Sequence, residues 1–354
     1  MRCVTSEFVK TLNRSNVKGF QTEILQTHTT ALFNTAVKRA SELLRAGEVV
    51  AVPTETVYGL AANALDANAV EKIYEAKGRP KHNPIIVHVA SLEMARDCAS
   101  EWPESADKLA KSFWPGPLTV VLPRSRKIPN VVTAGGETVG IRWPGHPFTQ
   151  AVIRECGFPL AAPSANRASE ISPTNAEHVH KSLGEKISLV IDGGQSQVGI
   201  ESTVVDLTTT PPRVLRPGMI HEESLVAAVG EVRSQESEVR SQKLKSPGLL
   251  RKHYAPKAKL VILNWQNEPD LRSQLLTLNF QPSTCHIIAH TRIPSGENFA
   301  RVSVIPHDAE AFARAIYAEL HRCDEAGARL IVVEAVPSTF EWRAIADRLT
   351  RASA

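Results

Sequence analysis

The sequence predicts an α/β protein of two domains: a larger, α+β-like first domain with a large twisted mixed sheet and flanking helices, and a small second α/β domain. Three observations lead to this prediction. The chain of 354 residues is long for a single hydrophobic core. Before residue 220, runs typical of strands outnumber helical patterns. After a polar stretch that nearly repeats EVRSQ (231–242), strands and helices alternate, which is typical of a parallel sheet.

The first predicted helix and strand are recognised by their ends. The segment "NTAVKRASELLRAG" offers Asn34 or Thr35 as N-cap and has Gly47 after its last turn. The apolar run that follows predicts a buried strand at 48–52. This strand ends at Pro53, because proline cannot donate to a sheet ladder.

The other elements of the first domain follow from the same reasoning. Asp66 as N-cap and Gly78 as C′ residue bound a second helix, and a capping box from Thr174 to Glu177 begins a later one. We expect further strands at 84–90, 117–123, 138–144, 159–163, 188–192, 202–207 and 213–217, and further helices at 103–112, 147–156 and 174–183.

The second domain shows a regular alternation of strand and helix, which predicts a small Rossmann-like fold with a parallel sheet. Its strands are expected at 259–263, 285–289 and 329–334, and its helices near 269–278, 308–324 and 340–351. The chain then divides into an N-terminal extension (1–30), a first domain (31–221), a linker (222–255) and a second domain (256–354).

Composition and charge exclude several classes of protein. Apolar residues at 42% and charged residues at 22% are typical of a soluble globular chain. A net charge of +4 permits an anionic partner without demanding one. The five cysteines are scattered and form no C-x-x-C pair, which argues against a disulfide framework or a cysteine zinc site. The sequence has no long apolar run and a polar N-terminus, so we expect a cytoplasmic protein without membrane association.

Phosphate-binding motifs of the common kinds are missing. The sequence contains no G-x-x-x-x-G-K-[ST], no G-x-G-x-x-G and no H-E-x-x-H, and the dipeptide Gly-Lys does not occur. No G-x-S-x-G elbow accompanies the serines at the strand ends, which argues against a catalytic triad. A nucleotide would therefore be held by other donors.

Polar residues gather instead where predicted strands end. In "KGRPKHNP", Lys77, Arg79 and Asn83 surround a glycine and two prolines; the segment is either a phosphate clamp or a solvated basic loop. In "AAPSANRASEISPT", small residues precede Ser164, Asn166 and Ser172, so this loop either admits a ligand close to the backbone or simply leads into a helix.

Four more residues complete this pattern. Ser202 opens a predicted strand and Arg216 ends another. Arg142 lies in a strand beside a tryptophan and needs a carboxylate partner, from the protein or from a ligand. His88 on an apolar strand is either a core residue or a site residue. Together, the strand-end clusters predict one pocket for a phosphorylated or carboxylated ligand.

Several motifs, in this order, resemble the threonylcarbamoyl-AMP synthase family: "PTETVYGL", "KGRP" with "NP" three residues later, "APSAN" with "SPT", "STVVDL" and "LRPG". "SPGLLRKHYAPKAKL" and the α/β tail resemble the two-domain form of the family, so the resemblance covers about residues 35 to 350. The family often has Ser-Gly where this chain has Ala168 and Ser169, a difference that concerns the local turn.

The resemblance implies a nucleotidyltransferase that joins L-threonine, bicarbonate and ATP into threonylcarbamoyl-AMP and releases pyrophosphate. Mg²⁺ would accompany the triphosphate. The product would pass to the tRNA threonylcarbamoyl transferase machinery that modifies adenosine next to the anticodon in tRNAs reading ANN codons; direct tRNA contact is left open. Positioning and charge stabilisation would supply the catalysis, which explains the missing nucleophile.

The resemblance also implies roles for particular residues. Lys77 and Arg79 are assigned to catalysis as well as to ATP. Tyr254, in "HYAP", would close the linker over the nucleotide as a lid. The L-threonine set is Thr56, His88, Arg142, Ala162 and Ser202, and the ATP set is Lys77, Arg79, Asn83, Thr138, Ser164, Asn166, Ser172, Arg216 and Tyr254.

Two other functions are considered. A non-catalytic RNA-binding module could use the same basic surface to hold an RNA backbone. A carbamoyl transferase acting on a protein or a small molecule is the third hypothesis, and the absence of zinc-finger and acylphosphatase-like segments argues against it.

Overall fold

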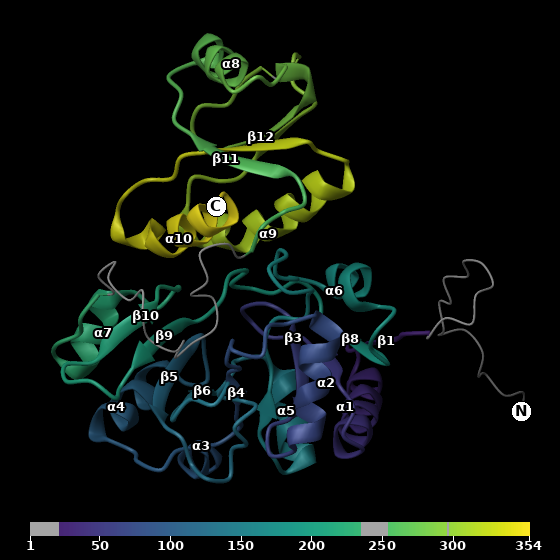
Figure 1. Ribbon diagram of the computed structural model, residues 1–354, viewed down its shortest axis with the longest axis vertical. Helices are drawn as coiled ribbons and strands as arrows, with labels where there is room; N and C mark the ends of the chain where they lie inside the picture. Colours follow the sequence, from purple (N-terminus) through teal and green to yellow (C-terminus); the bar gives the residue numbers. More distant parts are fainter. Residues whose placement is uncertain (1–20, 235–253, 296) are drawn as a thin grey trace, which may run out of the picture.

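The computed structural model describes residues 21–234, 254–295 and 297–354 and contains two sheets (Figure 1). The first is a ten-stranded mixed sheet with the order β1-β8-β2-β3-β7-β4-β6-β5-β9-β10. Its strands are β1 (Glu23–Gln26), β2 (Val50–Val52), β3 (Gly59–Asn63), β4 (Val87–His88), β5 (Leu118–Pro123), β6 (Thr138–Arg142), β7 (Leu160–Ala161), β8 (Leu189–Asp192), β9 (Thr203–Asp206) and β10 (Arg213–Arg216). The prediction of a large mixed sheet is confirmed.

Helices cover both faces of the first sheet. They are α1 (Thr30–Arg45), α2 (Ala67–Lys77), α3 (Leu92–Cys98), α4 (Glu104–Phe113), α5 (Pro147–Cys156), α6 (Ala176–Leu183) and α7 (Glu222–Val229). Successive residues of a strand point to opposite faces. Accordingly, Val50 and Val52 of β2 pack with α1 and α5, whereas Ala51 belongs to the core on the side of α2, α4 and α6.

Local signals explain where α2 begins and ends. The Asp66 carboxylate accepts hydrogen bonds from the N–H groups of Asn68 and Ala69, as predicted for an N-cap. Gly78 adopts the left-handed conformation (φ 60°) and ends the helix. The chain therefore reverses its direction between Lys77 and Arg79, two residues of the predicted site.

Two predicted caps are wrong. The N-cap of α1 is Thr29, whose side chain accepts from the Leu32 N–H, rather than Asn34 or Thr35. Helix α6 is capped by Asn175, which accepts from the His178 N–H, rather than by Thr174. In both cases a neighbouring residue of the same capping class takes the position, a choice that local composition cannot make.

Some elements lie outside the predictions. The sequence pattern predicts no element at β3, at α3 or at Arg301–Val304, which forms strand β13. Strand β1 lies within the extension predicted for residues 1–30 and pairs in parallel with β8, and α7 lies within the predicted linker. The predicted strand 84–90 is reduced to Val87 and His88, because its first half bonds to a loop: the Ile85 N–H donates to the Val132 carbonyl. The EVRSQ stretch falls mostly outside the described residues.

The second domain is a four-stranded parallel sheet in the order β11-β14-β12-β13, as its alternating pattern predicts. Helix α8 packs on one face, and α9 and α10 pack on the other. The elements are β11 (Lys259–Leu263), β12 (Cys285–Ala289), β13 (Arg301–Val304), β14 (Leu330–Glu334), α8 (Glu268–Thr277), α9 (Ala309–Glu325), α10 (Arg343–Ala352) and the 3₁₀ turns η1 (Pro282–Thr284) and η2 (Phe340–Trp342).

Helices α9 and α10 face the first domain (Figure 1). Val57, Ile171 and Ile200 of the first domain share one apolar cluster with the side chains of these helices. Gly199 has its backbone against α9, because a Cβ atom there would lie 2.4 Å from the Ala313 carbonyl oxygen. The two domains are therefore packed as closely as elements of a single core.

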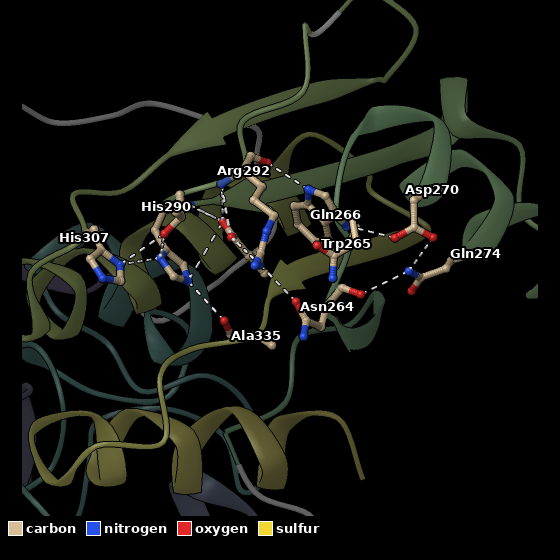
Figure 2. A network of polar contacts seen from close by, with 11 residues as sticks. Asn264, Trp265, Gln266, Asp270, Gln274, His290, Arg292, His307 and Ala335 are labelled. Atoms are coloured by element: carbon tan, nitrogen blue, oxygen red, sulfur yellow. Dashed lines mark hydrogen bonds and ion pairs between the residues drawn. The ribbon is translucent and has the colours of Figure 1, made fainter.

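The carboxyl edge of the second sheet is held by its own side chains (Figure 2). The Glu334 carboxylate, at the end of β14, accepts hydrogen bonds from the N–H groups of His290, Thr291 and Arg292, which follow β12. The His290 Nδ1 and His307 Nδ1 atoms lie 2.7 Å apart. Ligands of parallel sheets commonly bind at this edge, but here the backbone donors after β12 already bind an internal carboxylate.

None of the helices within 21–234, 254–295 and 297–354 is both long enough and apolar enough to cross a membrane.

Candidate active site between the two domains

A pocket lies where strand ends of the first sheet meet the linker that leads to the second domain. It is formed by segments far apart in the sequence: the turn between β2 and β3, the segment after α2, strand β4, the ends of β6, β7 and β10, the start of β9, and Tyr254. Its lining residues are Thr54, Thr56, Val57, Tyr58, Gly59, Arg79, Ile86, His88, Arg142, Ala162, Pro163, Ser164, Glu201, Ser202, Arg216 and Tyr254.

The turn after β2 is shaped by its own hydroxyl groups. The Thr54 hydroxyl donates to the Val57 carbonyl and lies 2.9 Å from the Thr56 hydroxyl. The Tyr58 hydroxyl donates to the Gly194 carbonyl, and Gly59 lies so close to Ala162 that a Cβ atom at Gly59 would be 3.3 Å from the Ala162 methyl group. These contacts fix Thr56 at the edge of the pocket.

Arg142, at the end of β6, is held by three protein groups. Its Nη1 donates to the Thr56 hydroxyl at 2.9 Å, its Nε donates to the Gly116 carbonyl at 3.3 Å, and its Nη2 lies 2.6 Å from the Glu55 Oε1. The last contact is a close ion pair whose angle is not that of a hydrogen bond. Glu55 is therefore the protein carboxylate that Arg142 was expected to need.

Glu55 is ionised in this pair. Burial alone would raise its pKa, but the Arg142 charge and the Gly145 N–H outweigh burial and hold the pKa below its ordinary value. His88 lies on the same side of the pocket and is neutral, because burial and the Arg142 charge lower its pKa to about 3. The region around Arg142 thus combines a balanced ion pair with neutral hydrogen-bonding groups.

Lys77 does not line the pocket but holds a loop that does. The ammonium group donates to the carbonyl oxygens of Ser164 and Asn166 and to the Asn166 side-chain oxygen. Burial and the nearby Arg79 charge lower its pKa well below the ordinary value. The loop carries Ser164 into the pocket, so the contacts of Lys77 are those of a residue that shapes the site; its catalytic role stays a prediction.

The opposite side of the pocket carries two buried guanidinium groups. Arg79 donates to the carbonyl oxygens of Asn83 and Pro84. Arg216 donates to the carbonyl and hydroxyl oxygens of Ser202, whose hydroxyl is 2.8 Å from that of Thr119. Burial lowers the pKa of Arg79 to about 10, which leaves it charged at neutral pH. These cations give this side of the pocket the character of an anion site.

Glu201 connects the pocket with the second domain. Its carboxylate accepts hydrogen bonds from the Ser172 hydroxyl at 2.6 Å, the Tyr317 hydroxyl at 3.1 Å and the Arg348 Nε at 2.8 Å. Burial alone would raise the pKa of Glu201, but the charges of Arg348 and Arg216 lower it below the ordinary value. A buried ionised carboxylate of the first domain is thus paired by α9 and α10.

Tyr254 has an unusual backbone conformation. Its φ angle of 62° lies in the left-handed region, which costs on the order of 1 kcal/mol or more for a residue with a side chain. Its ring is stacked on Tyr317 at 6.0 Å, and the Arg348 guanidinium lies over it at 5.5 Å. The second domain therefore holds Tyr254 against the pocket.

Ser169, where the family often has glycine, is also left-handed (φ 67°), so this turn keeps a glycine-like backbone.

The structure brings together nine of the fourteen predicted site residues in the pocket lining: Thr56, Arg79, His88, Arg142, Ala162, Ser164, Ser202, Arg216 and Tyr254. Lys77, Asn83 and Ser172 lie directly behind this lining and contact Ser164, Arg79 and Glu201, respectively. Asn166 is one step further away and contacts Lys77. Thr138 does not line the pocket. It is the first residue of β6, and Arg142, which does line the pocket, lies four residues further along the strand.

Sequence reasoning missed two carboxylates. Glu55 belongs to the motif "PTETVYGL", but its partner Arg142 comes 87 residues later. Glu201 precedes the predicted Ser202, and its partner Arg348 is 147 residues away. Each acid directly precedes a predicted site residue, Thr56 or Ser202. That position was the available signal, because an acid buried at a site needs a counter-charge.

The fold and the pocket define a class of protein: a two-domain α/β protein with a small-molecule site for anionic groups at the domain boundary. Comparisons with known proteins identify its family. A family model described as Telomere recombination matches residues 42–218, and one described as Threonylcarbamoyl-AMP synthase, C-terminal domain, matches residues 220–354. The chain belongs to the threonylcarbamoyl-AMP synthase family, in its two-domain form.

Three matches illustrate this family membership. The threonylcarbamoyl-AMP synthase of Pyrococcus abyssi is 41% identical over 90% of this chain and 94% of its own. A crystal structure of P. abyssi Sua5 complexed with L-threonine superposes with a TM-score of 0.86 at 37% identity, covering 94% of this chain and 98% of the other. A putative threonylcarbamoyl-AMP synthase of Mycobacterium tuberculosis is 36% identical; the match covers 86% of that protein but 53% of this chain.

Proposed function

We propose that this protein is a nucleotidyltransferase that forms L-threonylcarbamoyladenylate and pyrophosphate from L-threonine, bicarbonate and ATP. The observation that carries the proposal is that residues of both predicted sets, such as Thr56 and Arg142 on one side and Arg79 and Arg216 on the other, line one pocket. Membership of the threonylcarbamoyl-AMP synthase family supports the same conclusion.

L-Threonine would bind on the side of Arg142. The N–H groups of its guanidinium that make no hydrogen bond within the protein suit a carboxylate, with hydrogen bonds worth about 1.5–3 kcal/mol. Glu55 already balances the charge of Arg142. We therefore propose that the orientation of the Arg142 hydrogen bonds, more than net charge attraction, selects the carboxylate of the substrate. Ala162 leaves room for the side chain, and Ser202 and the neutral His88 offer hydrogen bonds. A P. abyssi relative complexed with L-threonine supports this proposal.

ATP would bind between Arg79, Arg216 and Tyr254. The two guanidinium groups suit phosphate oxygens, and the tyrosine ring suits a base or ribose face. Asn83, Thr138, Ser164, Asn166 and Ser172 complete the proposed ATP set. Lys77 would contribute through the loop that it holds. Tyr254 would act as the lid residue that shields the intermediate from water.

The reaction needs no protein nucleophile. The amine of threonine, after losing a proton, adds to CO₂ derived from bicarbonate and forms a carbamate. A carbamate oxygen then attacks the α-phosphorus of ATP: the new O–P bond forms, the bond to the β-phosphate oxygen breaks, and pyrophosphate leaves with the electron pair. Arg79 and Arg216, which line the pocket, would stabilise the charge that develops on the phosphates.

Mg²⁺ is proposed as part of the nucleotide substrate. Glu201, the carboxylate in the pocket lining, already accepts bonds from Ser172, Tyr317 and Arg348. Across the described parts of the chain, no three His, Cys, Asp or Glu side chains are grouped as metal ligands. The ion would therefore be coordinated by the triphosphate and by water, a common mode for Mg²⁺.

The product is a reactive mixed anhydride that must be consumed by an acyl-type transfer. We propose that the tRNA threonylcarbamoyl transferase machinery consumes it, to modify adenosine next to the anticodon in tRNAs that read ANN codons. A reducing cytoplasm suits the chain, since Cys98, Cys156, Cys285 and Cys323 are free thiols.

The test is pyrophosphate release by the purified chain with ATP, bicarbonate and L-threonine, with detection of threonylcarbamoyl-AMP. We expect release that requires all three substrates. Release without L-threonine, or no release, contradicts the proposal. Tight, steeply salt-dependent retention of tRNA without turnover would favour a non-catalytic RNA-binding module instead.

A further inference from the structure

The second domain reaches the pocket through one buried ion pair. We infer that Arg348, on α10, is a positioning residue for ATP: it holds Glu201, and through Glu201 it holds Ser172, in the geometry that binds the nucleotide. The inference rests on the proposed function, and it assigns to the second domain a direct part in substrate binding.

The contacts of Arg348 fit this role. Its Nε donates to the Glu201 carboxylate at 2.8 Å, and its Nη2 donates to the Pro217 carbonyl at 2.9 Å, directly after Arg216. The same guanidinium lies over the Tyr254 ring. Arg348 thus contacts the acid, the end of β10 and the lid residue at once, and its side chain is 1% exposed.

The charges explain why removal of Arg348 would affect the pocket. Glu201 lies close enough to both Arg348 and Arg216 for each cation to lower the pKa of its carboxyl group. With Arg348 removed, the carboxylate would turn toward Arg216 and draw that guanidinium away from phosphate. The Ser172 hydroxyl, which donates a hydrogen bond to the Glu201 carboxylate, would move with that carboxylate.

The same helix offers a matched control. Arg343 also pairs with an acid of the first domain, with 2.7 Å between its Nη1 and the Glu222 Oε2. Its side chain is 55% exposed, and it does not line the pocket. Arg343→Met therefore breaks an ion pair between the domains without leaving a buried charge.

The experiment measures ATP and L-threonine binding separately by isothermal titration calorimetry, with KM and kcat for pyrophosphate release. For Arg348→Met we expect roughly tenfold weaker ATP binding, within the range for residues of one polar network, and a smaller effect on L-threonine. Arg343→Met should match wild type. Glu201→Gln combined with Arg348→Met removes both charges and should recover most of the ATP affinity lost in the single variant.

Equal ATP affinities in Arg348→Met, Arg343→Met and wild type would overturn the inference. So would a folded double variant that binds ATP no better than Arg348→Met, because the effect would then not pass through Glu201. If Arg348→Met does not fold, Arg348→Gln decides: it keeps a polar side chain with hydrogen-bond donors but removes the charge, and wild-type ATP binding in it overturns the inference. Wild-type protein that shows no threonine-dependent turnover contradicts the proposed function instead.

Discussion

Arg142 has structural contacts as well as a proposed role in substrate binding. Its guanidinium is fixed by Gly116, Thr56 and Glu55, so its orientation is set before any substrate arrives. Such preorganisation lowers the entropy lost on binding. It also means that a substitution at Arg142 has two consequences, one for the ligand and one for the buried Glu55.

These two consequences can be separated. Arg142→Ala should weaken L-threonine binding by about 1.5–3 kcal/mol, more than it weakens ATP binding, and should lower stability by about 3 kcal/mol because Glu55 loses its cation. Adding Glu55→Gln should restore stability but not threonine affinity. Calorimetry and thermal unfolding report the two effects, and equal losses for both ligands would show that the role of Arg142 is misassigned.

His88 predicts a dependence of stability on pH. Burial and Arg142 lower its pKa from 6.5 to about 3 in the folded chain, so between these values the unfolded chain binds more protons. The free energy of unfolding therefore falls as pH falls below about 6.5. In denaturant unfolding at pH 7 and pH 5, His88→Gln should lose about 2 kcal/mol less than wild type. An identical pH dependence would contradict a neutral His88.

At the scale of elements, the turn after β12 depends on β14. The Glu334 carboxylate binds three consecutive backbone N–H groups, those of His290, Thr291 and Arg292. The position at which a parallel sheet commonly binds an anionic ligand is thus used to join two strands.

Glu334→Ala should therefore lower the stability of the second domain by about 2–3 kcal/mol, because it leaves these donors without their charged acceptor. Hydrogen exchange should show reduced protection of the same three amides. Glu297→Ala, at an exposed acid of the same domain, should change stability by about 0.5 kcal/mol or less. Similar effects of both substitutions would mean that the carboxylate is not a structural part of the turn.

The elements also show what a sequence can predict. Helix α5 was predicted with its observed bounds, because Pro147 and Gly157 mark its ends. Strand β7, by contrast, is only two residues long, since pairing with β3 and β4 defines it. The same distinction between local signals and tertiary contacts applies to the site. Strand-end clusters and the family resemblance together predicted nine of the residues that line the pocket, whereas the pairs Glu55–Arg142 and Glu201–Arg348 depend on tertiary contacts.

At the scale of the whole molecule, the domain boundary depends on Gly199. Gly199 has a φ of 84°, and a Cβ atom there would lie 2.4 Å from the Ala313 carbonyl oxygen. There is therefore no room for a side chain at this position. Helices α9 and α10 hold two residues of the pocket lining, because Tyr317 and Arg348 contact both Glu201 and Tyr254. The separation of the domains should therefore disturb the pocket.

Gly199→Ala should therefore reduce turnover and give a larger radius of gyration in solution scattering. Gly194→Ala is the matched control: its φ is 82°, but a Cβ atom there meets nothing within 4 Å. The control should lose about 1–2 kcal/mol of stability from backbone strain alone while keeping the domains together. If both variants behave alike, close packing at Gly199 does not hold the domains.

The buried pair of Glu201 and Arg348 also constrains how such a protein can change in evolution. Loss of the second domain would leave Glu201 without the cation of Arg348 and the hydroxyl of Tyr317, so replacement of the acid should come before, or together with, loss of the domain. The relative from M. tuberculosis matches little more than half of this chain. We expect such short relatives to carry an uncharged residue at the position of Glu201, and two-domain relatives to keep the acid and the arginine together.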